Sequence, residues 1–517
     1  MSAPHPPDPA HLSVEDWERG LQVARELRVA VFVVAYNAEA HIRETLQRIP
    51  AELLAELASI YVIDDKSVDR TTEIAGRLKA QIPILEVFTT PMNQGYGGNQ
   101  KLGFTYAIRQ DFDVVVLLHG DGQYAPEMLP SIIAPFAESD TAAVFGSRMM
   151  TRGGARRGGM PLYKYVGNRI LTSIENRLLD ASLTEFHSGY RAYRVSALAQ
   201  LPFRYNTNDF HFDTEIIIQL LARKMRIVEV PIPTYYGDEI CHVEGIPYAL
   251  NCVGTVLRAR ANQMYLVHHP KFDVYDGGEY VFKTAPSTVH QHVLARGWEA
   301  GTKVVELGAG HGHVSTALHG RGLEVAAVDL FPPERDFAFP YLEANLDQPF
   351  ADRVVEALGA PADVVLALDV IEHLGRPETS LQEIRRTMKP GATLVASTGN
   401  VGYLLVRLML LLGYFNYGKK GILDLTHTRL FTVRSFCRTL EGEGFRVASV
   451  RGFGPPIRDM IGTSPLLRFL DTTASFLSRV WPSLFGYQLL VEAQRLDGVD
   501  DILDSTVGAE TATAAAS

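Results

Sequence analysis

Residues 113–123 read DVVVLLHGDGQ, an apolar run that ends in a polar turn containing two glycines. The run Asp113–Leu118 predicts a buried strand, and His119, Asp121 and Gln123 follow it at alternate positions. Imidazole, carboxylate and amide groups with this spacing can converge on one divalent cation, for which Mg²⁺ or Mn²⁺ is the expected choice. Taken in isolation, the segment is better explained as a plain Asp-Gly turn between a strand and a helix.

The flanking segments predict that this turn belongs to an α/β domain. Apolar runs alternate with helical patterns such as Leu162–Leu179, which is typical of a sheet covered by helices. The further strand candidates are Arg28–Ala35, Ile60–Ile63, Ala142–Phe145 and Ile227–Val230. Asp64 and Asp65 follow one of these strands, where carboxylates face the ligand crevice of an open sheet and can bind a base or a ribose. A solvated turn with a helix cap at Asp69 explains the same residues equally well.

A second series of strands predicts a second α/β domain. Its first members are Thr302–Leu307, Leu323–Val328, Ala362–Leu368 and Ala392–Ser397. Phe445–Val450 and Tyr487–Ala493 are expected to form an antiparallel closing pair. A chain of 517 residues also exceeds what one ordinary hydrophobic core organises.

The stretch between the two series, from His268 to Gln291, shows no clear periodicity and carries Pro, His and Gly. We therefore expect the chain to divide there. The expected parts are an N-terminal extension (1–27), a first domain (28–267), a linker (268–291), a second domain (292–496) and a disordered tail (497–517).

Seven segments of the first domain form an ordered motif set. They are VVAYNAEAHI at 33–42, VIDDKSVDRT at 62–71, NQGYGGNQKLGF at 93–104, HGDGQYAPE at 119–127, GSR at 146–148, SGYRAYR at 188–194 and FDTEI at 212–216. Together they resemble the GT-A-type glycosyltransferases of family two, particularly the dolichyl- or polyprenyl-phosphate sugar transferases. The resemblance runs from about Val29 to Arg260 and implies a nucleotide-sugar-binding fold.

This resemblance implies roles for individual residues. Those expected to bind the nucleotide sugar are Ala35, Tyr36, Asn37, Glu39, Asp64 and Asp65. Asp121 resembles the central metal ligand, with His119 and Gln123 beside it, and Mg²⁺ or Mn²⁺ would bridge a diphosphate. Arg148 and Arg191 resemble arginines that the family places near phosphate. His119 departs from the family pattern, because many relatives carry Asp at that position.

The first domain lacks an obvious acidic base motif of the kind found in transferases that act on sugar hydroxyls. Because an acceptor phosphate is already an anion, it needs no general base. The sequence therefore favours a polyprenyl phosphate at a membrane surface over a glycan acceptor. Glu185, Asp213 and Glu215 remain candidates for a base if the acceptor is a hydroxyl.

Residues 306–312 read ELGAGHG directly after a strand candidate of the second domain. A glycine turn at this place lets a nucleoside cofactor lie against the backbone, and Asp329 ends the next strand, where an acid would hold a ribose diol. Taken alone, the turn fits a dinucleotide equally well. Three further segments separate these options, namely Leu346-Asp347, LDVIEHL at 368–374 and GILDLTHTRLFT at 421–432.

These segments resemble class I methyltransferases of the small-molecule type, over about Thr302 to Ala493. The resemblance implies a Rossmann-like sheet and S-adenosylmethionine as cofactor. The residues implied to bind it are Glu306, Gly308, Gly310, Gly312, Asp329, Asp347 and Asp369.

His373 and His427 are the candidate bases for methyl transfer, since imidazole titrates near neutrality. His373 can instead pack beside the cofactor, and His427 can form a structural bond with Asp424. Val401–Tyr414 is apolar on nearly every face. It is expected to cover the acceptor pocket, with a membrane-facing lid in which Arg407 reaches phosphate as the alternative.

The composition excludes several classes of protein. A formal net charge of −10 without basic clusters gives no reason to expect a nucleic-acid partner. The three cysteines, Cys241, Cys252 and Cys437, lack zinc-like spacing and are expected to be free thiols. No signal peptide or membrane-spanning run is recognisable, so a cytoplasmic protein, or one peripheral at the inner face of the membrane, is expected.

The sequence therefore predicts a bifunctional transferase. Its first domain would transfer a sugar from a nucleotide sugar to a polyprenyl phosphate or glycan, and its second a methyl group to a small molecule, glycan or lipid. The alternative is that only one domain is catalytic and the other is a degenerate binding module.

Overall fold

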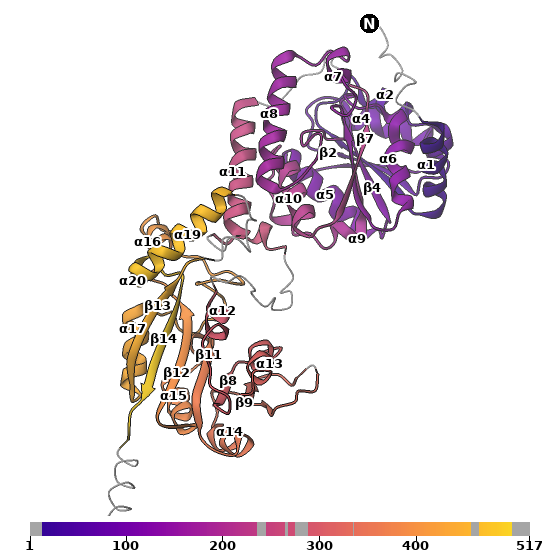
Figure 1. Cartoon of the computed structure of the whole chain (residues 1–517). Helices are drawn as coiled ribbons and strands as arrows, with labels where there is room; N and C mark the ends of the chain where they lie inside the picture. The colour runs from indigo at the N-terminus through magenta and orange to yellow at the C-terminus, as the bar shows by residue number, and fades with distance from the viewer. Residues whose placement is uncertain are drawn as a thin grey trace, which may run out of the picture. The chain divides into compact units, whose positions relative to one another are not determined.

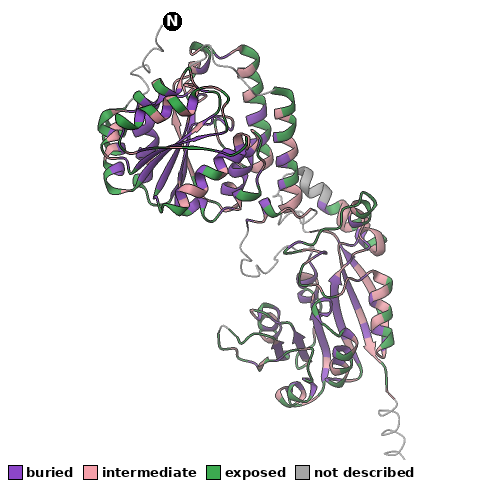
Figure 2. Cartoon of the chain, turned by 180° about the vertical axis from the view of Figure 1, so that it is seen from behind, coloured by how far each residue is buried: buried purple, intermediate pink, exposed green. Residues whose placement is uncertain are grey.

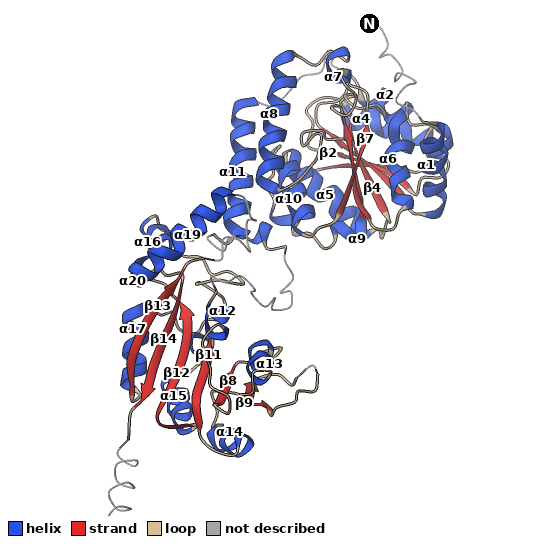
Figure 3. Ribbon diagram, in the orientation of Figure 1, coloured by secondary structure: helices blue, strands red, loops and turns tan. Residues whose placement is uncertain are grey.

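The computed structural model describes residues 13–234, 245–263, 267–274, 288–333, 335–455 and 465–498. The chain divides into two compact units, Met1–Asn262 with His269–Asp276 and Gln263–His268 with Gly277–Ser517. Each unit contains one sheet flanked by helices (Figures 1 and 3), so the predicted architecture of two α/β domains is confirmed. Outside the described residues lie Cys241, most of the expected tail (499–517), and parts of the expected extension (1–12) and linker (275–287).

Seven strands form the sheet of the first unit. They are β1 (Val29–Ala35), β2 (Ser59–Asp64), β3 (Leu85–Thr89), β4 (Val114–His119), β5 (Thr141–Ser147), β6 (Arg191–Arg194) and β7 (Arg226–Pro231). Their order is β3-β2-β1-β4-β6-β5-β7, and every pair is parallel except those of β6 with β4 and β5. The central strands read as unbroken apolar runs because both faces of the sheet are covered, as their burial in Figure 2 shows.

The helices of this unit cover both faces of the sheet. They are α1 (Val14–Glu26), α2 (Ile42–Gln47), α3 (Ala51–Leu54), α4 (Thr71–Arg77), α5 (Tyr96–Arg109), α6 (Leu129–Ile133), α7 (Gly154–Arg157), α8 (Leu162–Leu179), α9 (Val195–Leu198), α10 (Phe212–Ala222) and α11 (Gly245–Gln263). One core cluster joins the sheet to α1–α4 and α6, and another joins it to α5, α9 and α10. Helix α5 lies close to the sheet because residue 103 is glycine, and a Cβ there would lie 2.1 Å from the ring of Phe32.

The order of the strands reverses beside β1, which lies between β2 and β4. Ala35 pairs with Asp64 of β2, and Val34 pairs with His119 of β4, so the carboxyl ends of all three strands meet at one edge. Open α/β sheets bind their ligands outside the strand ends at such a reversal.

The sheet of the second unit also has seven strands. They are β8 (Lys303–Leu307), β9 (Glu324–Asp329), β10 (Tyr341–Glu343), β11 (Ala362–Leu368), β12 (Met388–Gly399), β13 (Phe445–Phe453) and β14 (Gln488–Arg495). Their order is β10-β9-β8-β11-β12-β14-β13. The first five are parallel to one another, and β14 runs antiparallel to both β12 and β13. The predicted antiparallel closing pair is therefore confirmed.

Helices again flank this sheet. These helices are α12 (Val289–Leu294), α13 (His313–His319), α14 (Ala351–Leu358), α15 (Pro377–Arg386), α16 (Leu404–Leu411), α17 (Val433–Gly442), α19 (Pro465–Val480) and α20 (Pro482–Phe485). The strand order of this sheet reverses beside β8, as it does beside β1 in the first unit. Leu307 at the end of β8 pairs with Val328 of β9 and with Ala367 of β11. Across the described residues of both units, no helix combines the length and apolar character needed to cross a bilayer.

Candidate active sites

The first candidate site lies at the edge where β1, β2 and β4 end. The structure brings together here the turn after β1, the acidic pair after β2 and the HGDGQ segment after β4. These segments are separated by dozens of residues in the sequence, and the parallel register of the three strands places them side by side. Their roles in binding remain predictions.

Asp64 and Asp65 are buried, and both carboxylates bind neighbouring parts of the chain. Asp64 accepts hydrogen bonds from the Ser67 hydroxyl and from Thr72 Oγ1, the latter at 2.7 Å. Asp65 accepts from the backbone N–H groups of Gln94 at 2.8 Å and Gly95 at 2.9 Å. The pair therefore orders the turn that leads to α4 and the start of α5.

The turn after β1 interlocks with the turn after β2. Asn37 adopts a left-handed backbone with φ of 49°, and its side-chain oxygen accepts from the N–H of Val68 at 3.0 Å. Glu39 accepts from the N–H of Arg70 at 3.0 Å. The side chain of Tyr36 is exposed at this edge, where it can stack on a flat ligand group.

His119 and Asp121 face one another across a gap that suits a cation. Tyr96 donates its hydroxyl hydrogen to Asp213, so its oxygen accepts from the Nε2–H of His119 at 3.2 Å. Burial lowers the pKa of His119, although Asp121 and Asp213 oppose this, so the ring is neutral near pH 7. Its Nδ1 then carries a lone pair and lies 4.0 Å from Asp121 Oδ2. Two ligand atoms at this separation fit either side of a divalent ion.

Gln123, the third residue of the predicted metal set, contacts Asp121 through its backbone. The other oxygen of Asp121 accepts from the backbone N–H of Gln123 at 3.0 Å, which fixes the carboxylate. Mg²⁺ is commonly held by one or two carboxylates together with substrate phosphates. The residues present therefore fit a divalent ion that a diphosphate completes. Tyr96 is the residue that the sequence interpretation missed, although it lies within the NQGYGGNQKLGF motif.

Arg148 and Glu185 form a buried ion pair. Glu185 accepts from Arg148 Nε at 3.0 Å and from its backbone N–H at 2.8 Å. Burial alone would raise the pKa of Glu185, but the charge and hydrogen bonds of Arg148 hold it below its usual value. An ionised carboxylate that is already paired is a poor general base, so this contact disfavours Glu185 as the base for a hydroxyl acceptor.

Arg191 lies in the interior of the unit, and its guanidinium binds the backbone. It is 1% exposed, and its Nη2, Nε and Nη1 donate to the carbonyl oxygens of Phe186 at 2.6 Å, Ser188 at 2.7 Å and Asp213 at 3.0 Å. The structure therefore does not bring Arg191 to the exposed edge beside Asp121. Its contacts indicate that it organises the loop before β6, and its predicted role near phosphate stays a prediction.

The second candidate site lies where β8 and β9 end. Gly308, Gly310 and Gly312 all adopt positive φ angles, of 67°, 51° and 67°. A Cβ on Gly308 would lie 2.6 Å from Val370, whereas one on Gly310 would meet nothing within 4 Å. Asp329 accepts from the N–H of Gly310 at 2.7 Å, so the acid and the turn are joined. This open, backbone-lined turn fits a nucleoside cofactor.

Two of the other predicted cofactor-binding acids bind the chain itself. Glu306 is buried at the end of β8 and accepts from the N–H of Ser315 at 2.8 Å at the start of α13. Burial raises the pKa of Glu306 to about 7. Asp347 is exposed and accepts from the N–H groups of Gly375 at 2.9 Å and Arg376 at 3.2 Å. Both acids therefore hold loops around the turn.

Asp369 ends β11 in a left-handed conformation with φ of 57°. Its carboxylate accepts from Ser397 Oγ at 2.7 Å and from Gln488 Nε2 at 2.5 Å. Glu372, which follows one turn later, is buried, and burial together with Asp369 raises its pKa to about 8. Glu372 was not among the predicted site residues, although it lies in the LDVIEHL motif.

The structure brings His373 and His427 together, with ring centroids 4.7 Å apart. His373 Nδ1 lies 3.2 Å from the carbonyl oxygen of Thr426, and His427 Nδ1 lies 3.0 Å from that of Ile422. A carbonyl requires a donor, so each neutral ring carries its hydrogen on Nδ1 and leaves a lone pair on Nε2. Burial and the neighbouring His373 lower the pKa of His427, which keeps it in the base form.

The structure gives the contacts of the two alternatives raised for this region. The backbone N–H of His427 donates to the Asp424 carbonyl at 3.1 Å, while the Asp424 carboxylate accepts from the N–H and hydroxyl of Thr426, both at 2.8 Å. Arg407 Nε donates to the Gly402 carbonyl at 2.6 Å, and its Nη2 donates to the Ser483 carbonyl at 3.1 Å. The apolar segment around α16 leaves its large side chains exposed at Leu408, Leu410, Leu411, Leu412 and Tyr414.

Comparisons with known proteins identify each unit separately. Residues 30–201 match the profile of glycosyl transferase family 2, and residues 279–450 match a profile described as a methyltransferase domain. The two matches do not overlap, and each falls mainly within one of the two compact units.

Several curated proteins resemble the first unit. An uncharacterized protein of Methanocaldococcus jannaschii is 29% identical over 210 residues, which are 41% of this chain and 82% of that protein. The undecaprenyl-phosphate mannosyltransferase of Micrococcus luteus is 28% identical over 207 residues, covering 40% and 83%. The UDP-N-acetylglucosamine–dolichyl-phosphate N-acetylglucosaminyltransferase of Methanococcus voltae is 28% identical over 222 residues, covering 41% and 86%.

Among solved structures, a SAM-dependent methyltransferase from Archaeoglobus fulgidus aligns with 40% of this chain and 94% of its own length. The identity is 18% and the TM-score is 0.28.

Proposed function

Because the N-terminal part of this chain belongs to family 2 of the glycosyltransferases and its C-terminal part is a methyltransferase domain, we propose one bifunctional enzyme. Its first unit transfers a sugar from a nucleotide sugar to a polyprenyl phosphate. Its second unit transfers a methyl group from S-adenosylmethionine to a glycan, lipid or small molecule of the same pathway. The relatives named as undecaprenyl- and dolichyl-phosphate sugar transferases support this acceptor.

The facing pair of His119 Nδ1 and Asp121 Oδ2 carries the first assignment. Mg²⁺ or Mn²⁺ bound there would neutralise the diphosphate that leaves with the nucleotide. Tyr96 holds His119 in the tautomer that presents a lone pair, and Gln123 fixes the Asp121 carboxylate through its backbone N–H. Because His119 is neutral, Asp121 supplies the only negative charge of this pair.

The second assignment depends on the glycine turn and the two histidines. S-adenosylmethionine supplies an already activated methyl group, so the protein has to orient the acceptor and remove one proton. Gly308–Gly312 and Asp329 present backbone and a carboxylate to the cofactor. His427, kept neutral by burial, offers Nε2 as the base, and His373 beside it holds the same tautomer.

Exposed apolar stripes on two neighbouring helices support a peripheral position at a membrane. Helices α8 and α11 lie side by side in Figure 1, and Arg260 of α11 donates to the Leu178 carbonyl. Large apolar side chains four residues apart are exposed on α8, at Leu162, Val166, Ile170 and Ile174. Those exposed on α11 are Ile246, Leu250 and Leu257. Such stripes suit the boundary between head groups and acyl chains, where a polyprenyl phosphate presents its phosphate.

Two parallel assays on the full-length protein test the two activities. One measures nucleoside diphosphate release from a panel of nucleotide sugars with Mn²⁺ and polyprenyl phosphate. The other measures S-adenosylhomocysteine release. We expect Asp121→Ala to abolish the first and spare the second, and Gly308→Val to do the reverse. If each substitution left its own reaction unchanged, both site assignments would be wrong.

Membrane association is tested separately, by flotation of the protein with vesicles that contain polyprenyl phosphate and anionic lipid. Ile170→Glu and Leu250→Glu are each expected to reduce the bound fraction. The matched control is Val14→Glu, which replaces an exposed apolar residue on α1 away from both stripes. Equal binding of all three variants would contradict the proposed surface.

The alternative that one unit is a degenerate binding module also has a supporting observation. Within the described residues, no group of three His, Cys, Asp or Glu side chains surrounds Asp121. A first unit that binds nucleotide sugar without turnover would give no diphosphate release under any condition. The same pair of assays therefore distinguishes the two proposals.

A further inference from the structure

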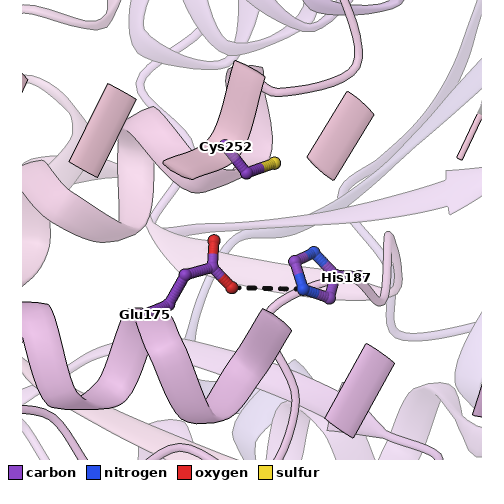
Figure 4. A group of neighbouring side chains, drawn as sticks. All are labelled: Glu175, His187 and Cys252. Atoms are coloured by element: carbon purple, nitrogen blue, oxygen red, sulfur yellow. Dashed lines mark ion pairs between the residues drawn. The ribbon is translucent and has the colours of Figure 1, made fainter. Parts of the chain in front are cut away.

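Three side chains from distant parts of the sequence meet inside the first unit, and none of them is among the residues assigned to the Asp121 site. They are Glu175 on α8, His187 in the loop before β6 and Cys252 on α11. One ligand atom from each lies within 4.8 Å of the other two. Figure 4 shows the carboxylate of Glu175 facing the ring of His187, with the thiol of Cys252 adjacent.

The contact between Glu175 and His187 has the geometry of two ligands of one ion. Glu175 Oε2 and His187 Nε2 lie 3.1 Å apart, a contact that is an ion pair only if the ring is protonated, and neither atom has a hydrogen-bond partner within the described structure (Figure 4). Two atoms bound tetrahedrally at about 2.0–2.1 Å from Zn²⁺ are separated by roughly 3.3 Å. The observed spacing therefore leaves both atoms directed at a common point.

The cost of burial also favours a cation at this point. The Glu175 side chain is 0% exposed and that of His187 is 9% exposed. A buried carboxylate oxygen without a hydrogen-bond donor is unfavourable unless a positive charge compensates it. Either a protonated His187 ring or a metal ion bound by both atoms provides that compensation, and the nearby Cys252 thiol favours the metal.

The surrounding groups orient each of the three side chains. The hydroxyl oxygen of Tyr248 lies 3.0 Å from His187 Nδ1, and the other ring nitrogen, Nε2, is turned toward Glu175. Thr214 Oγ1 lies 3.3 Å both from Cys252 Sγ and from Glu175 Oε1. Partners of this kind fix the tautomer and rotamers of metal ligands in proteins.

We propose that Glu175, His187 and Cys252 bind one Zn²⁺ ion, with a solvent molecule as the fourth ligand. A sulfur and an imidazole ligand favour zinc over the Mg²⁺ or Mn²⁺ proposed at Asp121. On binding, the Cys252 thiol releases its proton to solvent and the resulting thiolate binds the metal. This inference concerns a different site and does not depend on the proposed transferase activities.

The position of His187 gives this site a consequence for the rest of the unit. The His187 carbonyl accepts from Arg148 Nη2 at 3.1 Å. The carbonyls on either side of it, those of Phe186 and Ser188, accept from Arg191. A metal on His187 therefore fixes the loop to which both arginines are anchored. It would position these arginines in the first unit and would not act on the second unit.

Metal analysis of the full-length protein, purified without a histidine tag, tests the proposal. We expect close to one zinc per chain in the wild type, and at least a tenfold lower content in Cys252→Ala and in His187→Ala. Cys437→Ala is the matched control, since it removes a half-buried thiol from the second unit, and it should retain the metal. A wild type without zinc, or variants with unchanged zinc, would overturn the proposal.

Cobalt substitution keeps the test decisive if a variant does not fold. Addition of Co²⁺ to chelator-treated wild type is expected to produce a thiolate-to-cobalt charge-transfer band, which requires a cysteine ligand. Prior addition of Zn²⁺ should suppress the band. If Co²⁺ binds without this band, Cys252 is not a ligand and the site is not the one proposed.

Discussion

Replacing Glu306 with glutamine probes the electrostatics beneath the glycine turn. Glu306 is 5% exposed, and burial raises its pKa to about 7, whereas the same carboxyl titrates near 4.5 in an unfolded chain. At about 1.4 kcal/mol per pH unit, ionisation of this group costs the folded state roughly 3 kcal/mol more than it costs the unfolded state.

The sign of the effect follows from the higher pKa in the folded state. The protonated carboxyl stabilises the fold, and this contribution is complete below pH 4.5 and is lost as the pH rises through about 7. Glu306→Gln cannot ionise. Its free energy of unfolding should therefore rise relative to the wild type by roughly 3 kcal/mol between about pH 4 and pH 8.

Urea unfolding of cofactor-free protein at a series of pH values measures this difference. After unfolding at each pH, a short deuterium pulse at one fixed labelling pH is read by mass spectrometry. Peptides from β8 then report the second unit, and peptides from β1 serve as an internal reference.

Glu383→Gln should change the free energy of unfolding in the opposite direction relative to the wild type. Burial opposes the shift, but hydrogen bonds from Ala351, Arg386 and Phe350 hold the pKa of Glu383 below its usual value. Parallel curves for the wild type and Glu306→Gln would refute the reasoning.

Three further substitutions test the two sites. Gly189→Ala places a Cβ 2.5 Å from Nε2 of His119, so nucleoside diphosphate release should fall at least tenfold while S-adenosylhomocysteine release is unchanged; equal activity would show that His119 can move freely. Glu185→Gln leaves the buried Arg148 without its counter-charge, and should lower the stability of the first unit by about 3–5 kcal/mol in urea unfolding; a loss below 1 kcal/mol would contradict a dry ion pair. His427→Gln should lower methyl transfer by about 10²–10⁴-fold with cofactor binding retained in calorimetry; since burial lowers the pKa of His427, wild-type activity should persist below pH 6.5, and a loss that sets in well above that pH would assign the base elsewhere.

The strand ends could be predicted from the sequence because an apolar run that stops at an acid or glycine marks the edge of a buried sheet. The Asp64 and Asp121 positions follow from this pattern alone, as does the turn at Gly308. The antiparallel closing pair of the second unit was predictable from two further strand-like segments, an alternating one at Phe445–Val450 and an apolar one at Tyr487–Ala493.

The partners of those residues could not be predicted, because contacts between distant segments leave no local pattern. The sequence motif around Arg191 is the same whether its guanidinium faces a ligand or the loop carbonyls, and the structure places it on the carbonyls. Tyr96 and Asp213 are separated by more than a hundred residues, yet they set the tautomer of His119. Glu175, His187 and Cys252 likewise have no recognisable spacing.

The loop from Phe186 to Ser188 is recognised by Arg148 and Arg191 through its main-chain oxygens. Main-chain oxygens are present whatever the side chain, so these contacts depend on the number of residues in the loop and not on their identity. The insertion or deletion of one residue would shift every carbonyl relative to two fixed guanidinium groups. Among homologous enzymes, this loop should therefore keep its length even where its side chains differ.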